Sequence, residues 1–328
     1  MTKRSRGAGA GGDAADLRID PHYMRATITG MATVFVTGGT GFVGRAVVRA
    51  LRGRGHQVRC LVRPGSERRL APETGVEAVA GDVTVPAGLA DVLRGTDAVV
   101  HLVGIIREHR RRGVTFERLH TEATRHVLAA AQAAGVRRVV HMSALGTRPD
   151  ARSRYHQTKW AAEEAVRASG LAWTIFRPSV IFGPGDGFVT LLTRLVRWFP
   201  VVPVIGDGRN RLQPVAVETV AAGFAGALDR PATAGQVFDV GGPRAYAFDE
   251  VLDEVGAVLG RRRVPKLHHP VGLMAPVVRL LEGIPAFPLT SDQLLMLGED
   301  NTCDPVPFHR TFELTPVEFA AGIRAYLR

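Results

Sequence analysis

Three side chains in the middle of the chain have the types and the spacing of a proton-transfer site. Tyr155 and Lys159 are four residues apart in a segment of helical periodicity, so they would share one helix face. An ammonium beside a phenol favours the phenolate, so we expect Lys159 to lower the pKa of Tyr155 and to hold a cofactor ribose. Ser143 ends an expected strand and could orient a carbonyl or hydroxyl oxygen. Ser143, Tyr155 and Lys159 therefore predict general acid–base catalysis on a small molecule.

A tyrosine and a lysine at this spacing also occur on ordinary helix surfaces. The upstream stretch Val34 to Leu51, VFVTGGTGFVGRAVVRAL, favours an active site instead. A β-branched run leads into glycines and then into apolar residues at helical spacing, which predicts a strand, a turn and a helix. The start of such a helix binds pyrophosphate through its free N–H groups, and glycines allow close approach. The residues expected to line this dinucleotide site are Thr37, Gly38, Gly39, Thr40, Gly41, Phe42, Val43 and Gly44.

The residue after the second expected strand bears on the form of the cofactor. An acid there would accept hydrogen bonds from the adenosine ribose, but this chain has Arg63. An arginine can pair with a 2′-phosphate, so NADP(H) is favoured and NAD(H) is the alternative; Arg63 could also stack on adenine or face water. Asp82, followed by Val83, is expected near the adenine amino group, and Gly104 ends the fourth strand where the cofactor crosses the sheet.

The elements that must position these groups alternate regularly. Further strands are expected at residues 56–63, 76–82, 97–104, 138–143 and 173–183, with helices at 87–93, 115–134 and 155–168. This alternation predicts an α/β fold, a doubly wound parallel sheet of the Rossmann type. A late strand at 236–242 would return to the sheet.

A smaller lobe should follow, because the pattern becomes irregular after Gly183. We expect a disordered extension at residues 1–30, an NAD(P)-binding domain at 31–242 to which 184–212 adds part of the lobe, and an interleaved C-terminal substrate lobe at 243–328 with two or three helices. Asp186 and Phe188 would line the substrate mouth, although Asp186 could instead cap the next helix. The apolar stretch 268–289 is expected in the lobe core, or as an apolar mouth for a lipid-like or quinone-like substrate.

Composition excludes several functional classes. The 328 residues carry a formal net charge of +11, but the arginines are scattered and no aromatic residues interleave with them, so no nucleic acid partner is expected. Cys60 and Cys303 have no metal-ligand spacing, so we expect no metal and a reducing compartment. No charge-free apolar stretch reaches about 18 residues. The prediction is a cytoplasmic protein, with peripheral attachment to an anionic membrane as the alternative.

The motifs TGGTGFVG, GDV, HLVG, HMSALG, YHQTK and FRPSVIFGPGD together resemble the atypical, extended-like short-chain dehydrogenase/reductase superfamily, which is NAD-dependent epimerase/dehydratase-like. Their order resembles the subgroup with the large NADPH-binding accessory subunit of respiratory complex I and its bacterial relatives. LQPVAVETVA, VFDVGGP and LTSDQLLMLGEDN extend the similarity from Ala32 to Arg328. The resemblance implies contact of the nicotinamide with the backbone of Pro178, Ser179 and Val180. His120 departs from the pattern, because many extended members have an asparagine there that supports the lysine through water.

The resemblance leaves three functions open. The first is an NADPH-favouring oxidoreductase that moves hydride to or from a carbonyl, hydroxyl or quinone-like substrate. The second is a non-catalytic NADPH-binding accessory, assembly or redox-sensing protein, because the complex I subunit is regarded as holding its cofactor for structural reasons. The third is an NAD-dependent epimerase or dehydratase of nucleotide sugars, against which Arg63 argues. Association with a respiratory complex is implied as a partner.

Overall fold

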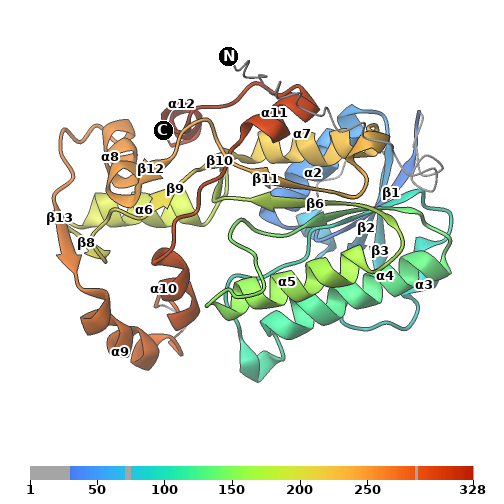
Figure 1. The fold of residues 1–328 in the computed structure, drawn as a ribbon, viewed down its shortest axis with the longest axis horizontal. Coiled ribbons are helices and arrows are strands. Elements are labelled where there is room, and N and C mark those ends of the chain that lie inside the picture. The colour runs from blue at the N-terminus through green and yellow to red at the C-terminus, as the bar shows by residue number, and fades with distance from the viewer. Residues whose placement is uncertain (1–29, 71–74, 285–286, 328) are drawn as a thin grey trace, which may run out of the picture.

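The computed structural model describes residues 30–70, 75–284 and 287–327, and a seven-stranded parallel β-sheet forms its centre (Figure 1). The order is β11-β6-β5-β4-β1-β2-β3. The strands are β1 (Thr33–Thr37), β2 (Gln57–Val62), β3 (Val76–Ala80), β4 (Ala98–His101), β5 (Arg138–Met142), β6 (Ala172–Pro178) and β11 (Gln236–Val240). This confirms the predicted doubly wound α/β fold. The extension expected at residues 1–30 lies outside the described residues, except for Gly30.

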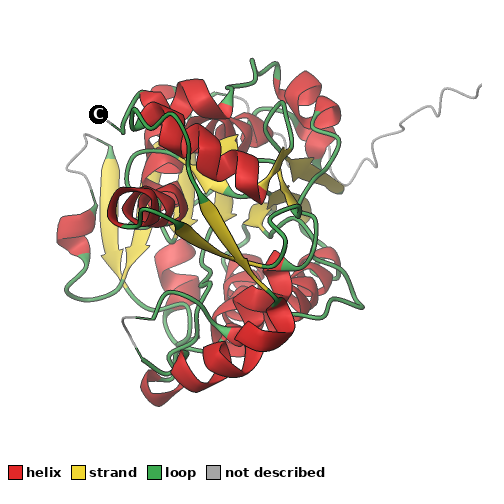
Figure 2. Ribbon diagram, turned by 90° about the vertical axis from the view of Figure 1, so that its left-hand side faces the viewer, coloured by secondary structure: helices red, strands yellow, loops and turns green. Residues whose placement is uncertain are grey.

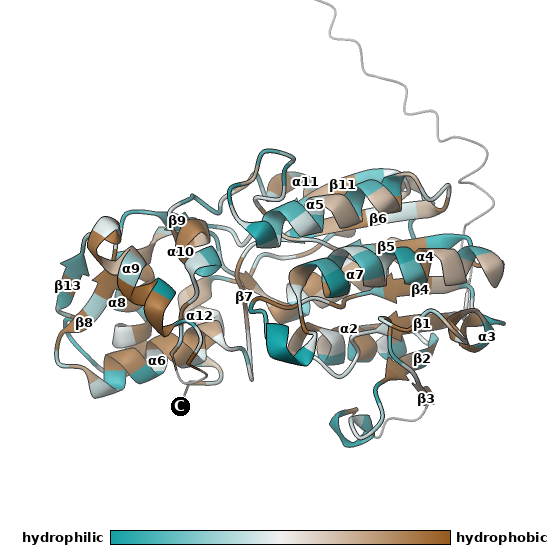
Figure 3. Ribbon diagram, turned by 90° about the horizontal axis from the view of Figure 1, so that it is seen from below, coloured by the Kyte–Doolittle hydropathy of each residue, from teal (hydrophilic) through white to brown (hydrophobic). Residues whose placement is uncertain are grey.

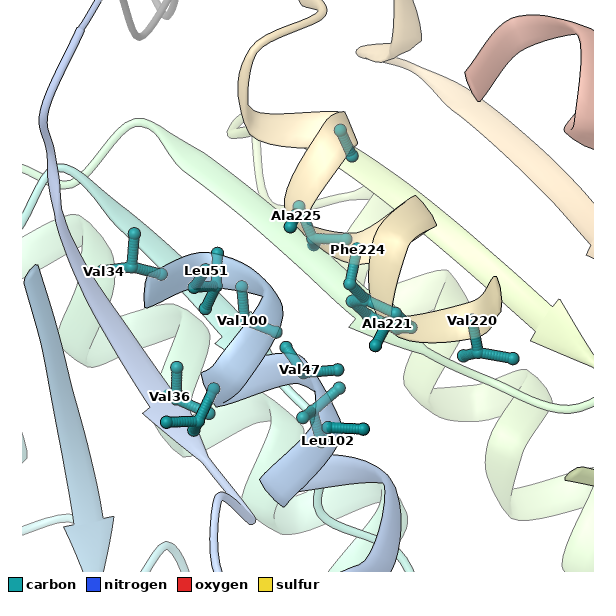
Figure 4. Packing of buried hydrophobic residues seen from close by; sticks show 14 of the residues in the cluster. Val34, Val36, Val47, Leu51, Val100, Leu102, Val220, Ala221, Phe224 and Ala225 are labelled. Carbon is teal, nitrogen blue, oxygen red and sulfur yellow. The ribbon is translucent and has the colours of Figure 1, made fainter. Parts of the chain in front are cut away.

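Helices cover both faces of the sheet. One face carries α2 (Phe42–Gly53) and α7 (Val217–Leu228), and the other carries α3 (Leu89–Leu93), α4 (Ala123–Ala133) and α5 (Arg154–Arg167). In β1 the side chains alternate: Val34 and Val36 enter the core under α2 and α7, and Phe35 enters the opposite core. Figure 4 shows Val47 and Leu51 of α2, which are one helical turn apart, packed in the first core. The central strands β1 and β4 are buried on both faces of the sheet, which explains why they are rich in valine.

The lobe lies at the end of the molecule that faces the viewer in Figure 2. Its core combines residues 182–216 with residues 246–264 and 319–327. The elements are β7 (Ile181–Phe182), α6 (Phe188–Trp198), β8 (Val202–Ile205), β9 (Arg211–Leu212), β10 (Val215–Ala216), β12 (Tyr246–Ala247), α8 (Phe248–Val258), β13 (Lys266–His269), α9 (Val271–Leu281), α10 (Ser291–Leu297) and α12 (Phe319–Arg324). The division at residues 242 and 243 stays a prediction.

Several element boundaries differ from those expected. The strand expected over 173–183 breaks after Pro178, because Ser179 N donates to Val240 O and β7 then pairs with β10 in a separate two-stranded sheet. The helix expected over 115–134 begins with a π-helix at Glu117–Glu122. Short 3₁₀ turns occur at Glu67–Arg69, Arg110–Arg112 and Pro231–Thr233. In the described residues five helices, α8 to α12, follow Tyr246 where two or three were predicted.

The described part of the apolar stretch, residues 268–284 and 287–289, is largely exposed, so its expected place in the lobe core is wrong, and the alternative of an apolar substrate mouth stays a prediction. Its helix α9 has one buried residue, Val278. Within the described residues, the elements packed on α9 leave most of its circumference open to solvent.

The late helix α11 (Val306–Phe312) belongs to the nucleotide-binding half. Its Phe308 is 1% exposed and lies edge-on to Phe176 of β6, with 5.7 Å between ring centroids. Phe308 also fills the space over Gly223 of α7, where a Cβ would lie 2.6 Å from the ring. The C-terminal part of the chain therefore completes the core under the sheet.

We predict that Phe308→Ala lowers the free energy of unfolding by about 3–5 kcal/mol, because it removes a buried ring and leaves a cavity. Urea denaturation followed by circular dichroism measures the change. Val306→Ala is the matched control on the same helix, since Val306 is 56% exposed and should change stability by no more than about 0.5 kcal/mol. Equal effects of the two substitutions would contradict the placement of α11 in the core.

Candidate active site

The glycine turn leaves the start of α2 open. Gly38 has a φ of 78°, which favours glycine, and Gly41 N donates to Gly38 O over 3.0 Å to close the turn. A Cβ on Gly44 would overlap the Gly38 carbonyl oxygen, so the helix can lie against the turn only with glycine there. No side chain caps α2 and its first turn holds no acid. The first N–H groups of this helix are therefore suited to an anionic ligand such as a pyrophosphate.

Thr37 and Arg63 stand at the carboxyl ends of the neighbouring strands β1 and β2, and they differ in exposure. Thr37 is buried, and its Oγ1 is 2.6 Å from Nδ1 of the buried His101 on the neighbouring strand β4; its role in cofactor binding stays a prediction. Arg63 is exposed directly after β2, the strand beside β1, and its guanidinium has no partner within the described residues.

The third predicted position, Asp82, follows β3. Asp82 Oδ1 accepts from Thr84 N at 2.8 Å, which fixes a turn, and Val83 is buried in the core on the α3 and α4 face. Asp82, Val83 and Arg63 thus follow adjacent strands of the sheet at its carboxyl edge, and their roles in cofactor binding stay predictions.

Lys159 of α5 lies beside the ends of two strands, β4 and β5. It is 2% exposed, and its Nζ donates to Met142 O, 2.9 Å away, on the residue before Ser143. A Cβ on Gly104 would lie 3.0 Å from the same Nζ. Burial lowers the pKa of the Lys159 ammonium to about 8, and Glu163 one turn further along α5 opposes that fall. The structure thus places Lys159 beside the ends of β4 and β5, and its predicted role in holding the cofactor ribose stays a prediction.

Tyr155 lies one turn before Lys159, in an aromatic setting. Its ring meets Phe116, His120 and His156 edge-on, with centroids 5.2–5.8 Å away. Burial raises the pKa of the Tyr155 phenol to about 12, and the nearby Asp292 carboxylate adds to the rise. The expected lowering by Lys159 is therefore wrong here. The ammonium is directed at Met142 O, and burial outweighs its attraction for the phenolate. Tyr155 is held protonated, as a proton donor needs.

Asp292 is a site residue that sequence reasoning missed. It lies on α10, and its two carboxylate oxygens accept from Arg154 N at 2.6 Å and from Tyr155 N at 3.1 Å. It therefore caps the first turn of α5 together with Ser153, whose Oγ accepts from His156 N. The contact joins residues 137 positions apart, so no local pattern could have indicated it.

The crossing segment, residues 290–301, makes further contacts with the loops of the site. Glu299 accepts two hydrogen bonds of 2.9 Å from Arg148, in the loop after Ser143. Asn301 accepts from Ser179 Oγ at 2.6 Å and donates to Leu145 O at 3.1 Å. The crossing segment therefore ties the start of α5, the loop after β5 and the loop after β6 to one another.

His120 occupies the place behind Lys159. It is buried on the π-helix, and its Nδ1 is 2.9 Å from Thr158 Oγ1, while Nε2 is 3.1 Å from both N and O of Ile105. Burial, and then the Lys159 ammonium, lower the pKa of His120 well below its usual value, so the ring is neutral. A π-bulge at this point is typical of functional sites. The imidazole thus supports the backbone beside Gly104.

Of the remaining predicted residues, Ser143 is buried and its Oγ lies 3.4 Å from Thr147 Oγ1. Pro178 O accepts from Leu145 N in the loop after Ser143, whereas Val180 O accepts from Val215 N at the start of β10.

Asp186, proposed for the substrate mouth, is buried at 3% exposure and is a helix cap. Its carboxylate accepts from Val189 N at 2.6 Å, from Gly183 N at 3.2 Å and from Tyr326 Oη at 2.8 Å. These bonds support the alternative that the sequence left open. Phe188 is half-buried against the lobe core. Among the described residues no group of three or more His, Cys, Asp or Glu could hold a metal ion, and no helix has the length and apolar character needed to cross a membrane.

Comparison with known families and proteins identifies the class of protein. A family model described as NAD(P)H-binding matches residues 38–191, and one described as an RmlD substrate binding domain matches residues 146–247. The mitochondrial NADH dehydrogenase [ubiquinone] 1 alpha subcomplex subunit 9 of Arabidopsis thaliana is 32% identical over 289 residues, which are 84% of this chain and 70% of that protein. The chain therefore belongs to the atypical short-chain dehydrogenase/reductase superfamily of NAD(P)-binding, oxidoreductase-like proteins, and the predicted class of nicotinamide cofactor is confirmed.

Within that superfamily the chain is similar both to complex I subunits and to reductases. Ceramide reductase of Caulobacter vibrioides is 36% identical over 189 residues, 58% of each chain, so this chain spans little more than half the length of that relative. NAD(P)H azoreductase of Xenophilus azovorans is 27% identical, covering 70% of this chain and 74% of the azoreductase.

Solved structures share the fold. The crystal structure of gox2253 has a TM-score of 0.72 at 25% identity and covers 89% of this chain and 96% of its own. The dTDP-glucose 4,6-dehydratase DesIV of Streptomyces venezuelae, solved with NAD and TYD bound, has a TM-score of 0.68 at 24% identity and covers 89% and 95%.

We predict that Asp292→Asn lowers the pKa of Tyr155 while keeping it above the ordinary value near 10, because the charge is removed but burial, the larger cause, remains. Asparagine still offers one oxygen to the start of α5, so the fold should persist. Tyrosinate absorbance during an alkaline titration, read as the difference from Tyr155→Phe, reports this pKa. Glu299→Gln is the control on the same segment, because that carboxylate faces Arg148; the same shift in both variants would contradict the assignment.

Proposed function

We propose that the chain is an NADPH-preferring oxidoreductase that reduces a carbonyl or quinone-like substrate, or oxidises the corresponding hydroxyl. The observation that carries the proposal is the buried Lys159, which lies beside Gly104 and Met142 and one turn after a protonated Tyr155. The reductases among its relatives support this reaction class. The exposed, unpartnered Arg63 after β2 supports a 2′-phosphate on the cofactor.

The glycine turn and the uncapped start of α2 fit the pyrophosphate of such a cofactor. Bound NADPH would supply the hydride, which carries two electrons to the substrate carbon. Tyr155 would give its phenolic proton to the substrate oxygen, and its high pKa keeps that proton available at neutral pH. Ser143 would donate a hydrogen bond to the same oxygen. Lys159 would hold the nicotinamide ribose, since Nζ lies at the strand ends that the cofactor crosses.

A second candidate function is a non-catalytic NADPH-binding accessory or assembly protein of a respiratory complex. The similarity to subunit 9 of the mitochondrial NADH dehydrogenase, over most of this chain, favours it. It uses the same glycine turn and Arg63 but requires no proton transfer from Tyr155. The unpaired Cys60 and Cys303 support a reducing compartment such as the cytoplasm for either function. An NAD-dependent epimerase or dehydratase is the third candidate, and Arg63 disfavours it.

We predict that Tyr155→Phe lowers turnover about a hundredfold to ten-thousandfold and leaves the Kd for NADPH unchanged, because only the proton donor is lost. NADPH oxidation with a panel of carbonyl and quinone compounds, together with fluorescence titration of NADPH, measures both quantities. Oxidation of no compound by the wild type, with tight and slowly released NADPH, would favour the accessory function. Unchanged turnover in Tyr155→Phe would remove this residue from the mechanism.

We predict that Arg63→Asp weakens NADPH binding and shifts selectivity toward NADH, since an acid repels the 2′-phosphate and accepts from ribose hydroxyls. Calorimetric titration with each cofactor measures the ratio of the two Kd values. Arg68→Asp is a matched control. Arg68 is also exposed, but it lies in the 3₁₀ turn Glu67–Arg69, five residues further from the end of β2 than Arg63. If the wild type binds both cofactors equally and the variant does the same, Arg63 does not select the cofactor.

A further inference from the structure

Helix α9 presents an apolar surface to solvent on almost every side. It has 11 residues, VGLMAPVVRLL, with Val278 alone buried and Arg279 alone charged. Leu273 is 64% exposed and Leu280 is 80% exposed. Figure 3 shows α9 largely in the brown of hydrophobic residues at the lobe end. Large exposed apolar patches mark interaction sites, and an apolar helix is normally covered.

The exposed apolar surface continues from α9 to the end of α6. Leu267 of β13, four residues before α9, pairs with Pro203 of β8, and both residues are exposed. The chain just before β8 exposes Phe199 and Val201, and Trp198 at the end of α6 is 81% exposed. We call the exposed side chains of α9, with Leu267, Trp198, Phe199 and Val201, the apolar end surface.

Arginines border the apolar end surface. Arg261 donates to Phe199 O at 3.1 Å and so lies against the end of α6. Arg262 and Arg263 follow it and are exposed, and within the described residues their guanidinium groups have no hydrogen-bond or ion-pair partner. The nearby Asp253 is already paired with Lys266 at 2.6 Å. Glu254 lines the same pocket as these arginines, but within the described residues it forms no ion pair with them, so the border keeps a net positive charge.

We propose that the apolar end surface docks on an anionic lipid bilayer, with α9 lying in the plane of the interface. At about 16 Å, α9 is too short to cross a bilayer core of about 30 Å, but its apolar side chains suit the acyl boundary. Trp198 suits the headgroup level, and Arg262 and Arg263 match anionic headgroups. A second copy of the chain fits less well, because a two-fold interface over this surface would bring two sets of unpaired arginines together.

Docking through α9 would fix the orientation of the candidate active site relative to the bilayer. This inference does not depend on which reaction the site catalyses. Arg107, which follows Gly104 by three residues, donates to Glu282 O at 2.6 Å and to Ile284 O at 3.0 Å, just past the end of α9. Glu282 in turn accepts from Ser291 N at 2.7 Å, and Ser291 precedes Asp292. The C-terminal end of α9 is thus held both to the loop after β4 and to the crossing segment.

Flotation of the full chain with vesicles tests the proposal. We expect binding to vesicles that mix phosphatidylcholine with phosphatidylglycerol, weaker binding to phosphatidylcholine alone, and release by salt. The emission of Trp198 should shift to shorter wavelength on binding, and Trp198→Phe should abolish the shift. Trp160 and Trp173 are partly buried beside Arg167 and should not respond.

The double variant Leu273→Asp with Leu280→Asp should weaken vesicle binding by about tenfold or more for each leucine. Arg262→Gln with Arg263→Gln should weaken it about fivefold for each arginine and reduce the salt dependence. Val306→Asp is the control, because Val306 is an exposed valine on α11, outside the apolar end surface. Circular dichroism and thermal melting establish that each variant is folded.

Three results would overturn the proposal. The first is a folded wild type that does not float with anionic vesicles. The second is flotation that the leucine double variant leaves unchanged. The third is a dimer, seen by light scattering, that this double variant dissociates while wild-type vesicle binding is absent; the apolar end surface would then be an interface between proteins.

Discussion

The hydrogen bond from Lys159 Nζ to Met142 O is the contact on which the candidate active site depends. It places a buried ammonium between the ends of β4 and β5, where ligands bind in doubly wound sheets. Burial of a charge is costly, and the chain compensates through Glu163, one turn along α5. Glu163 is itself held by Arg177 and Arg167. The ion pairs behind α5 therefore hold the lysine at the sheet edge.

The parts of the site that could be predicted from the sequence are those encoded over a few residues. The glycine turn after β1 and the four-residue spacing of Tyr155 and Lys159 each report a local geometry. Apolar strands that alternate with helices along the chain likewise predicted the parallel sheet, because strands joined by helices pair in parallel and are covered on both faces. The break of the sixth strand after Pro178 could not be predicted, since it depends on pairing of β7 with the distant β10.

Electrostatics was the least predictable part of the site. Tyr155 and Lys159 alone indicated a lowered phenol pKa, but the environment raises it through burial and through Asp292. Asp186 could be assigned to a helix cap only after Tyr326 and Val189 were seen at its carboxylate. Asp292 and Tyr326 are far away in the chain from the residues they contact, and the extent of side-chain burial is not visible in the sequence. Composition also failed to reveal that α9 is uncovered, because apolar residues in a sequence do not indicate whether anything packs on them.

The crossing segment has a consequence for the order in which the protein forms. The sheet, the glycine turn and most of its covering helices come from residues 33–240, whereas the caps and ties at Tyr155, Arg148 and Ser179 come from residues 292–301. Contacts of such long sequence separation are closed late, after local units have folded. During synthesis the nucleotide-binding turn would therefore exist before the start of α5 is clamped. A nascent chain that has already acquired a dinucleotide fold would still lack a finished reaction centre.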